Sequence, residues 1–184
     1  MKSMREIFRS HCVFDANGKH IGGTDKASNH NYGPAYDALF PDRSKVKLMM
    51  EIGITDGSSM LAWREIFPEA LIVGMDIEWC PLAGERLEVH KGDQREFEAC
   101  MRAAGNRQFD FILEDAYHSL DNTLLTLFWL WPFVKPGGIY IVEEFYNIGA
   151  TKANVLALLP NVEIVDTAGP FGGNEPLVAM RKPL

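Results

Sequence analysis

The sequence predicts an α/β domain with a doubly wound, mostly parallel sheet of seven strands that ends in an antiparallel hairpin. From residue 46 onward, short apolar runs typical of buried strands alternate with segments whose apolar residues have helical spacing. Strands that alternate with helices form a parallel sheet. The last two apolar runs are instead separated by a glycine-rich stretch, which favours a hairpin.

The first strand and helix of this pattern are the clearest. Residues 46–53 form an apolar run that ends at an acid and a glycine. The next stretch places Met60, Trp63 and Ile66 at helical spacing and ends at Pro68, which cannot continue a helix. Later strands are expected at residues 70–77, 85–93, 109–115, 139–144 and 161–167 and within 169–183. Later helices are expected at residues 95–105 and 120–134.

Composition limits the classes of partner. A chain of 184 residues with 47% hydrophobic and 23% charged residues has the balance of one globular domain. Its net charge of -7 argues against nucleic acid, which is bound by clustered Lys and Arg. The longest apolar stretch, residues 124–134, contains a proline and is shorter than the roughly 20 residues of a membrane span. We therefore expect a core helix there, and no membrane partner.

The N-terminus and the cysteines predict a cytoplasmic protein. Residues 1–12 lack the apolar segment of a secretory signal. Cys12, Cys80 and Cys100 are odd in number and have no metal-binding spacing, so we expect free thiols in a reducing compartment. Residues 1–45 are expected to form a helical and loop extension that acts as a lid, and residues 46–184 the main domain. A chain this small could also close its site as a homo-oligomer.

The stretch EIGITDGSS, residues 51–59, predicts a ligand at the end of the first strand. It contains Glu51, Gly53 and Gly57, and glycine lets a backbone approach a ligand closely. The spacing differs from the GxGxxG of dinucleotide binders. It is closer to the ExGxGxG turn of S-adenosylmethionine-dependent methyltransferases, with Thr55 in place of the middle glycine. The alternative is a tight turn without a ligand.

Acids that follow the next two strands strengthen this interpretation. Asp76 ends the second strand, where nucleoside-binding sheets place the carboxylate that binds the ribose hydroxyls. Asp93, with Gln94 beside it, follows the third strand and is expected near the adenine. The alternatives are a solvated Asp at a strand end and an ordinary turn Asp.

Two acidic doublets end the fourth and fifth strands. The fourth ends in Glu114 and Asp115, and the fifth in Glu143 and Glu144. Burying an ionised carboxylate is costly unless it is paired or bound to a metal. Neighbouring strands lie about 4.8 Å apart, so these acids could reach one ion. Oxygen ligands without cysteine suit a hard cation such as Mg²⁺, Mn²⁺ or Ca²⁺.

His118 follows Asp115 by three residues and should lie above the same site. Histidine is the side chain that most readily exchanges a proton near neutral pH, so His118 is a candidate base for a substrate hydroxyl. The alternative is a capping or surface histidine.

At these residues the sequence resembles the metal-dependent O-methyltransferases that modify sugar hydroxyls of macrolide antibiotics. The matching segments run in order from Gly22 to Phe145: GGTDKASNHNYGPAYDALF, EIGITDGSSMLAW, GMDI, KGDQ, FILEDAYHSLDN and VKPGGIYIVEEF. The resemblance implies a Rossmann-like class I methyltransferase domain over residues 46–184. It also implies S-adenosylmethionine and a divalent metal, Mg²⁺ in the first place, as cofactors.

The resemblance also implies roles for individual residues. His118 matches the general base, and Asp115, Glu143 and Glu144 match the metal ligands. Gly53, Ser59, Asp76 and Asp93 match cofactor-site positions, and the segment of Thr24 resembles one that closes over the cofactor. Glu51 of the glycine turn and Gln94 beside Asp93 are expected at the same site. The chain departs from the family at Ala116 and Tyr117, which replace a Gly-Ser pair, and at Glu144, which replaces Asp. No role for Glu114 follows.

The predicted activity is methyl transfer from S-adenosylmethionine to a hydroxyl of a small molecule, such as the sugar moiety of a natural product. A catechol-type acceptor is an alternative, because Tyr117, Phe145 and Tyr146 would suit a flat ring. A second alternative is a non-catalytic subunit that only binds the cofactor. The acidic doublets with His118 argue against it, because a catalytically silent fold has no reason to keep costly charges together.

Overall fold

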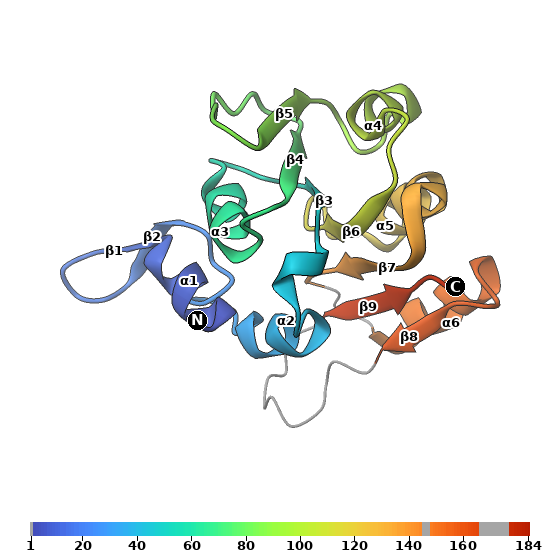
Figure 1. The fold of residues 1–184 in the computed structure, drawn as a ribbon, viewed down its shortest axis with the longest axis horizontal. Helices are drawn as coiled ribbons and strands as arrows, with labels where there is room; N and C mark the ends of the chain where they lie inside the picture. The colour runs from blue at the N-terminus through green and yellow to red at the C-terminus, as the bar shows by residue number, and fades with distance from the viewer. Residues whose placement is uncertain (1, 145–147, 166–176) are drawn as a thin grey trace.

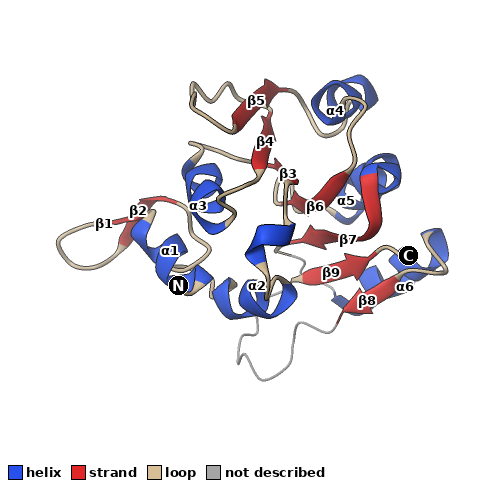
Figure 2. Ribbon diagram, in the orientation of Figure 1, coloured by secondary structure: helices blue, strands red, loops and turns tan. Residues whose placement is uncertain are grey.

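A seven-stranded sheet forms the centre of the computed structural model, which describes residues 2–144, 148–165 and 177–184. The strands are β3 (Leu48–Ile52), β4 (Leu71–Asp76), β5 (Leu87–Lys91), β6 (Phe109–Glu114), β7 (Val134–Val142), β8 (Glu163–Val165) and β9 (Val178–Arg181). Their order across the sheet is β5-β4-β3-β6-β7-β9-β8, and helices cover both faces (Figures 1 and 2).

The strand directions confirm the predicted fold class. The five strands from β5 to β7 are parallel, β9 is antiparallel to β7, and β8 is antiparallel to β9. The order reverses between β3 and β6, which is where doubly wound sheets bind ligands. The glycine-rich loop predicted between the last two strands falls on residues 166–176, outside the described residues, as do Phe145 and Tyr146.

Two apolar cores lie on the two faces of the sheet. One face packs against α1 (Met4–Ser10), α2 (Gly33–Leu39) and α3 (Ser58–Ile66) through an aromatic cluster. The other packs against α4 (Phe97–Ala104), α5 (Leu120–Leu130) and α6 (Ile148–Leu158). Covering both faces explains why the central strands read as unbroken apolar runs, as in β6, where Phe111, Ile112 and Leu113 are all fully buried.

The N-terminal segment packs on the sheet domain and shares its core. Phe8 of α1 and Tyr36 of α2 lie 4.8 and 4.9 Å, between ring centroids, from Trp63 of α3. Between these helices a short hairpin of β1 (Cys12–Phe14) and β2 (His20–Gly23) projects from the body (Figure 1). The lid role and the boundary at residue 45 stay predictions.

Several local features differ from the sequence prediction. The β1–β2 hairpin and α6 were not predicted. The apolar segment after residue 120 is a helix only to Leu130, followed by the 3-10 turn η2 (Trp131–Phe133) at Pro132. Phe128 lies in the segment expected to form a core helix but is 60% exposed, while its neighbour Leu127 is fully buried. A second 3-10 turn, η1 (Arg43–Lys45), precedes β3.

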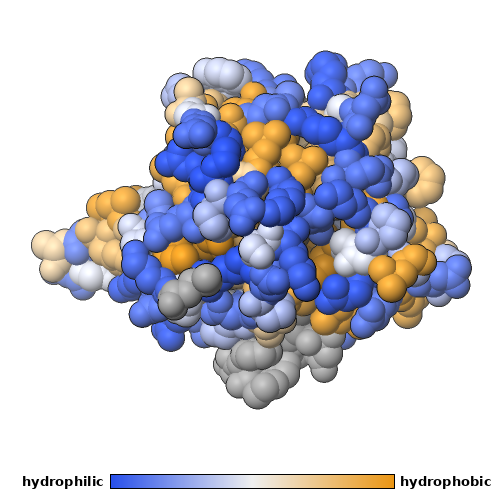
Figure 3. Space-filling model, viewed as in Figure 1, coloured by the Kyte–Doolittle hydropathy of each residue, from blue (hydrophilic) through white to orange (hydrophobic). Residues whose placement is uncertain are grey.

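The surface is mostly polar, with separate apolar patches. Figure 3 shows one such patch at the projecting hairpin, where Val13 and Ile21 are exposed. In the part of the chain that the structure describes, no helix combines the length and the apolar character needed to cross a membrane.

Candidate active site

The carboxyl ends of the central parallel strands lie level with one another. Ile52 of β3 lies opposite both Met75 of β4 and Glu114 of β6. Glu114 in turn lies opposite Val142 of β7. The residues that follow directly are Gly53, Asp76, Asp115 and Glu143. Four sequence-predicted site residues therefore begin one row along the edge of the sheet.

The turn after β3 has the backbone that its glycines predict. Gly53 has φ of +86°, and a Cβ there would lie 2.2 Å from the carbonyl oxygen of Asp115. Thr55, the substitute for the middle glycine, also has a left-handed φ of +48°. A threonine held in this conformation is strained, which is common at binding sites.

Asp76 organises the same turn. Its Oδ2 accepts hydrogen bonds from the backbone N–H groups of Ile54 and Thr55, both at 2.8 Å. Its Oδ1 accepts from the N–H of Glu78 at 3.0 Å. Asp76 thus links the end of β4 to the turn after β3.

A first cavity of about 180 Å³ lies between this turn and the ends of β4 and β5. Asp93 lines it and is held by the guanidinium of Arg95, with Nη2 2.5 Å from Oδ2. These hydrogen bonds lower the pKa of Asp93, against a smaller opposing effect of burial. Arg95 also lies over the ring of Tyr117, which lines the cavity and is 67% exposed.

Gln94 and Glu114 form a buried polar link between β5, β6 and α5. Gln94 Nε2 donates to Glu114 Oε1 at 3.0 Å and to Thr126 at 3.2 Å. Thr123 donates to Glu114 Oε2 at 2.9 Å, and the N–H of Tyr117 donates to Gln94 Oε1 at 2.8 Å. Burial raises the pKa of Glu114. Glu114 therefore supports the loop that carries Asp115 and His118, the role that the sequence left unassigned.

A lysine from the N-terminal segment lies among the acids on the other face. Lys26 Nζ is 2.6 Å from Asp115 Oδ2, 2.5 Å from Glu143 Oε2 and 3.5 Å from Glu51 Oε1. Tyr36 of α2 donates to Glu143 Oε1 at 2.5 Å. Burial raises the pKa of Glu143 well above its usual range, and Lys26 opposes that effect.

The remaining predicted cofactor residues surround this group. Glu51 is fully buried and accepts from Ser59 Oγ at 2.7 Å. Burial raises the pKa of Glu51 as well. Thr24 is buried and accepts from the N–H of Lys26 at 3.4 Å.

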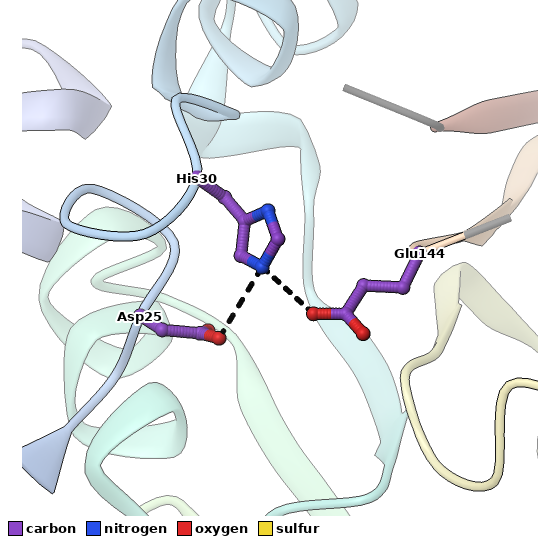
Figure 4. Close-up of side chains that lie close together, drawn as sticks. All are labelled: Asp25, His30 and Glu144. Carbon is purple, nitrogen blue, oxygen red and sulfur yellow. Dashed lines mark ion pairs between the residues drawn. The ribbon is translucent and has the colours of Figure 1, made fainter. Parts of the chain in front are cut away.

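Glu144 is held by two histidines. Its Oε1 lies 2.7 Å from His30 Nε2, and its Oε2 lies 3.2 Å from His118 Nε2. His30 Nε2 is also 3.5 Å from Asp25 Oδ2 (Figure 4). Asp25, His30 and Glu144 offer ligand atoms within 4.8 Å of one another, so they could contribute to a metal site.

A second cavity of about 310 Å³ adjoins the first, and Gly53, Thr55 and Asp115 line both. His118 and Glu144 line it, together with Thr24, Ser59 and Lys26. His118 and Glu144 have left-handed φ angles of +38° and +55°. Three of the four non-glycine residues with positive φ in the described ranges thus line one cavity, and such strained residues cluster at binding and active sites.

The structure therefore brings the predicted residues together in two neighbouring groups. Glu51 and Glu143 line neither cavity and lie buried beneath the second group. Sequence reasoning gave no role to Asp25, Lys26, His30 or Tyr36, although all four lie in the GTDK segment that carried the family resemblance. The ordered spacing of that segment was the available signal.

The sheet order, the acid and glycine turn and the row of acids at the strand ends define the Rossmann-like fold of class I methyltransferases. The MycE methyltransferase of the mycinamycin biosynthetic pathway, solved in complex with Mg and SAH, matches 99% of this chain and 55% of its own, with a TM-score of 0.79 and 19% identity. A putative ribosomal RNA methyltransferase from Plasmodium falciparum matches with a TM-score of 0.57 and 17% identity over 81% of this chain and 94% of its own.

The relatives found by sequence comparison indicate a narrower class of enzyme than the solved structures do. The chain is 32% identical over 131 residues to demethylmacrocin O-methyltransferase of Streptomyces fradiae, which is 65% of this chain and 33% of that enzyme. It is 31% identical over 128 residues to mycinamicin VI 2''-O-methyltransferase of Micromonospora griseorubida, covering 64% and 32% of the two chains. The matched region spans about a third of these relatives. No family model matches the chain. The predicted resemblance to macrolide-sugar O-methyltransferases is confirmed.

Proposed function

We propose that this chain transfers a methyl group from S-adenosylmethionine to a hydroxyl of a small molecule, with the help of a divalent metal. The observation that carries the proposal is the pair of adjoining cavities that share Gly53 and Asp115. One has the turn and acids of a nucleoside site, and the other has acids and a histidine. The relatives named as O-methyltransferases of demethylmacrocin and of mycinamicin VI support the same reaction.

The first cavity would bind the cofactor. The turn at Gly53, which packs closely against the backbone of Asp115, would face the methionine part, and Asp76 would bind the ribose hydroxyls while its other contacts hold the turn. Asp93 lines the far side, where the adenine would lie, with Arg95 and Tyr117. Thr24 and Ser59 would complete the site from the second cavity, Glu51 would act through its hydrogen bond with Ser59, and Gln94 would act through the loop it supports.

The donor set fits a hard divalent cation such as Mg²⁺. Asp115, Glu143 and Glu144 would hold it. The ammonium of Lys26 between Asp115 and Glu143 supports this assignment, because it marks a position where the fold stabilises positive charge. A bound ion would place positive charge beside the acceptor hydroxyl and make it easier to deprotonate.

His118 would remove the hydroxyl proton. Its Nδ1 is buried and has no hydrogen-bond partner among the described residues, while Nε2 faces Glu144. A carboxylate on one ring nitrogen fixes the tautomer and makes the other the acceptor. As Nδ1 takes the proton, the oxygen forms a bond to the methyl carbon, the bond from that carbon to sulfur breaks, and S-adenosylhomocysteine is released.

The position of Tyr117 favours a sugar or another aliphatic acceptor over a catechol. Tyr117 lines the first cavity and is absent from the lining of the second, where His118 lies. It is thus placed beside the cofactor and away from an acceptor ring. We also propose that residues 1–45 act as the lid, supported by the reach of Lys26 and His30 into the site.

The reducing, cytoplasmic location expected from the sequence stays a prediction. Closure of the site by a homo-oligomer stays a prediction.

Calorimetry with S-adenosylmethionine and S-adenosylhomocysteine tests the first step. We expect both to bind, and no binding at about millimolar ligand would refute the methyltransferase proposal. Assays of labelled methyl transfer to sugars and to catechols, with Mg²⁺ or excess EDTA, test the rest. Full turnover in EDTA would remove the metal from the proposal.

The change His118→Ala tests the base. We expect turnover to fall by about 10²- to 10⁴-fold, the usual contribution of general base catalysis. Affinity for S-adenosylhomocysteine, measured by calorimetry, should stay the same. An equal loss of turnover and affinity would show that His118 is structural.

A further inference from the structure

Lys26 is unusual among the basic residues of this protein. Within the described residues it is the only lysine or arginine that is buried, at 1% exposure. It comes from the loop between β2 and α2, 89 residues before Asp115 and 117 before Glu143. A buried ammonium is costly unless it is paired, and here it is paired with two of the three carboxylates that are expected to bind a metal.

The charges keep Lys26 in its cationic form. Burial lowers the pKa of Lys26, but Asp115, Glu143 and Glu51 outweigh burial and raise it well above its usual range. One ammonium thus compensates part of the charge of three neighbouring carboxylates. Without it, Asp115 and Glu143 would repel each other across adjacent strands.

The contacts of Glu143 already include one cation. Its Oε2 is occupied by Lys26 and its Oε1 by the hydroxyl of Tyr36. A metal that bound Glu143 at the usual distance of about 2.1 Å would lie within a few ångströms of the ammonium. The repulsion between the two cations in a buried site would be large.

We propose that Lys26 and the divalent metal are alternative occupants of the site formed by Asp115 and Glu143. In the metal-free protein Lys26 holds the two carboxylates together, and metal binding displaces its ammonium toward the second cavity, which Lys26 also lines. This inference rests on the proposed metal site. It makes Lys26 a positioning residue that links metal binding to the segment carrying Thr24, Asp25 and His30.

Calorimetry with Mn²⁺ on the purified protein and on Lys26→Met tests the competition. If Lys26 occupies the carboxylates at least 90% of the time, it weakens the apparent metal affinity about tenfold or more. We therefore expect Lys26→Met to bind Mn²⁺ at least about tenfold more tightly. The matched control is Lys47→Met, which removes an exposed lysine paired with Glu69 and should leave the affinity unchanged.

A measurement on the unmodified protein does not depend on the folding of the variant. An amine-reactive label followed by peptide mass spectrometry reports the accessibility of each lysine. Lys26 should be protected without metal and should react several times faster with saturating Mn²⁺, while Lys47 reacts at one rate.

A Lys26 that stays protected at saturating Mn²⁺, or a Lys26→Met variant that binds Mn²⁺ no more tightly, would overturn the competition and leave the metal site standing. If neither protein bound Mn²⁺, the metal site of the proposed function would fail, and this inference with it.

Discussion

Glu114 and Glu143 lie at the ends of two neighbouring parallel strands, and both are buried, but different kinds of group hold their carboxylates. Glu114 lies opposite Val142, so it is one position short of Glu143 and faces the opposite side of the sheet. Its partners are the neutral Gln94 and Thr123. Glu143 is held by the ammonium of Lys26 and the hydroxyl of Tyr36.

The different partners indicate different roles in two doublets that look alike in sequence. Glu114 supports a loop, whereas Glu143 belongs to the proposed metal site. Glu114 faces α5 and fastens the loop after β6, whereas its neighbour Asp115 faces Lys26. A carboxylate with only neutral donors can be replaced by a neutral group of the same shape. A carboxylate that shares a cation with a second carboxylate, as Glu143 does, needs its negative charge for that contact.

The largest contrast is expected in activity. Glu143→Gln removes charge from the proposed metal site. Loss of an outer-shell partner of a metal costs roughly 10- to 100-fold, so we expect kcat/KM to fall by at least that factor. Glu114→Gln should stay within a few-fold of the unmodified protein, since an amide can bond to both Gln94 and Thr123. Methyl transfer assays with Mg²⁺ measure both. Equal losses would show that the two glutamates act alike.

A smaller contrast is expected in stability. Tyr36→Phe removes a donor to a buried carboxylate, and we expect the free energy of unfolding to fall by about 1.5–3 kcal/mol. Thr123→Val should cost about 1 kcal/mol, because Gln94 still donates to Glu114. Urea unfolding in EDTA measures both changes.

Tyr140→Phe is the matched control for Tyr36→Phe. Tyr140 is fully buried, but its hydroxyl has no hydrogen-bond partner within the described part of the chain. Its loss should be close to neutral. A similar cost for both tyrosines would mean that the ring, and not the bond to Glu143, carries the effect.

The fold and the convergence of the acids could be predicted because both follow from local patterns. Runs such as residues 109–113 identify strands, and parallel strands bring their carboxyl ends to one edge. Thr55, which replaces the middle glycine of the motif, has a glycine-like backbone in the structure. The β1–β2 hairpin was missed because its strands are short, although Asn17 and Gly18 form a turn signal between them.

The partners of the acids could not be predicted in the same way. Lys26 is 89 and 117 residues from the carboxylates it bridges, and no local pattern encodes a pair at that separation. The side of the sheet that each acid faces depends on the last residue of the strand. A shift of one position would exchange Glu114 and Asp115 between the two faces. The strand register in the structure shows which side of the sheet each acid faces, and the sequence of the doublets alone does not.

The smallest effect concerns the pH dependence of stability. Burial raises the pKa of Glu114 in the folded protein above its ordinary value of 4.5. The folded state therefore holds the proton more tightly than the unfolded state, and stability is lost as pH rises from about 4.5 through the raised pKa. The loss amounts to about 1.4 kcal/mol for each pH unit that separates the folded and unfolded pKa values. Glu114→Gln lacks this loss, so its free energy of unfolding relative to the unmodified protein should increase between pH 5 and pH 8.

Asp42 gives the opposite sign and serves as the control. Hydrogen bonds from Ser44 lower its pKa, so its contribution is present above its ordinary value of 3.8 and is lost only as pH falls through the lowered pKa. Relative to the unmodified protein, Asp42→Asn should therefore have a nearly constant free energy of unfolding from pH 5 to pH 8. Urea unfolding in EDTA at several pH values measures both variants. A flat difference for Glu114→Gln would mean that its neutral partners already offset the cost of burying its charge. Glu114 would then behave more like Glu143 than their different contacts indicate.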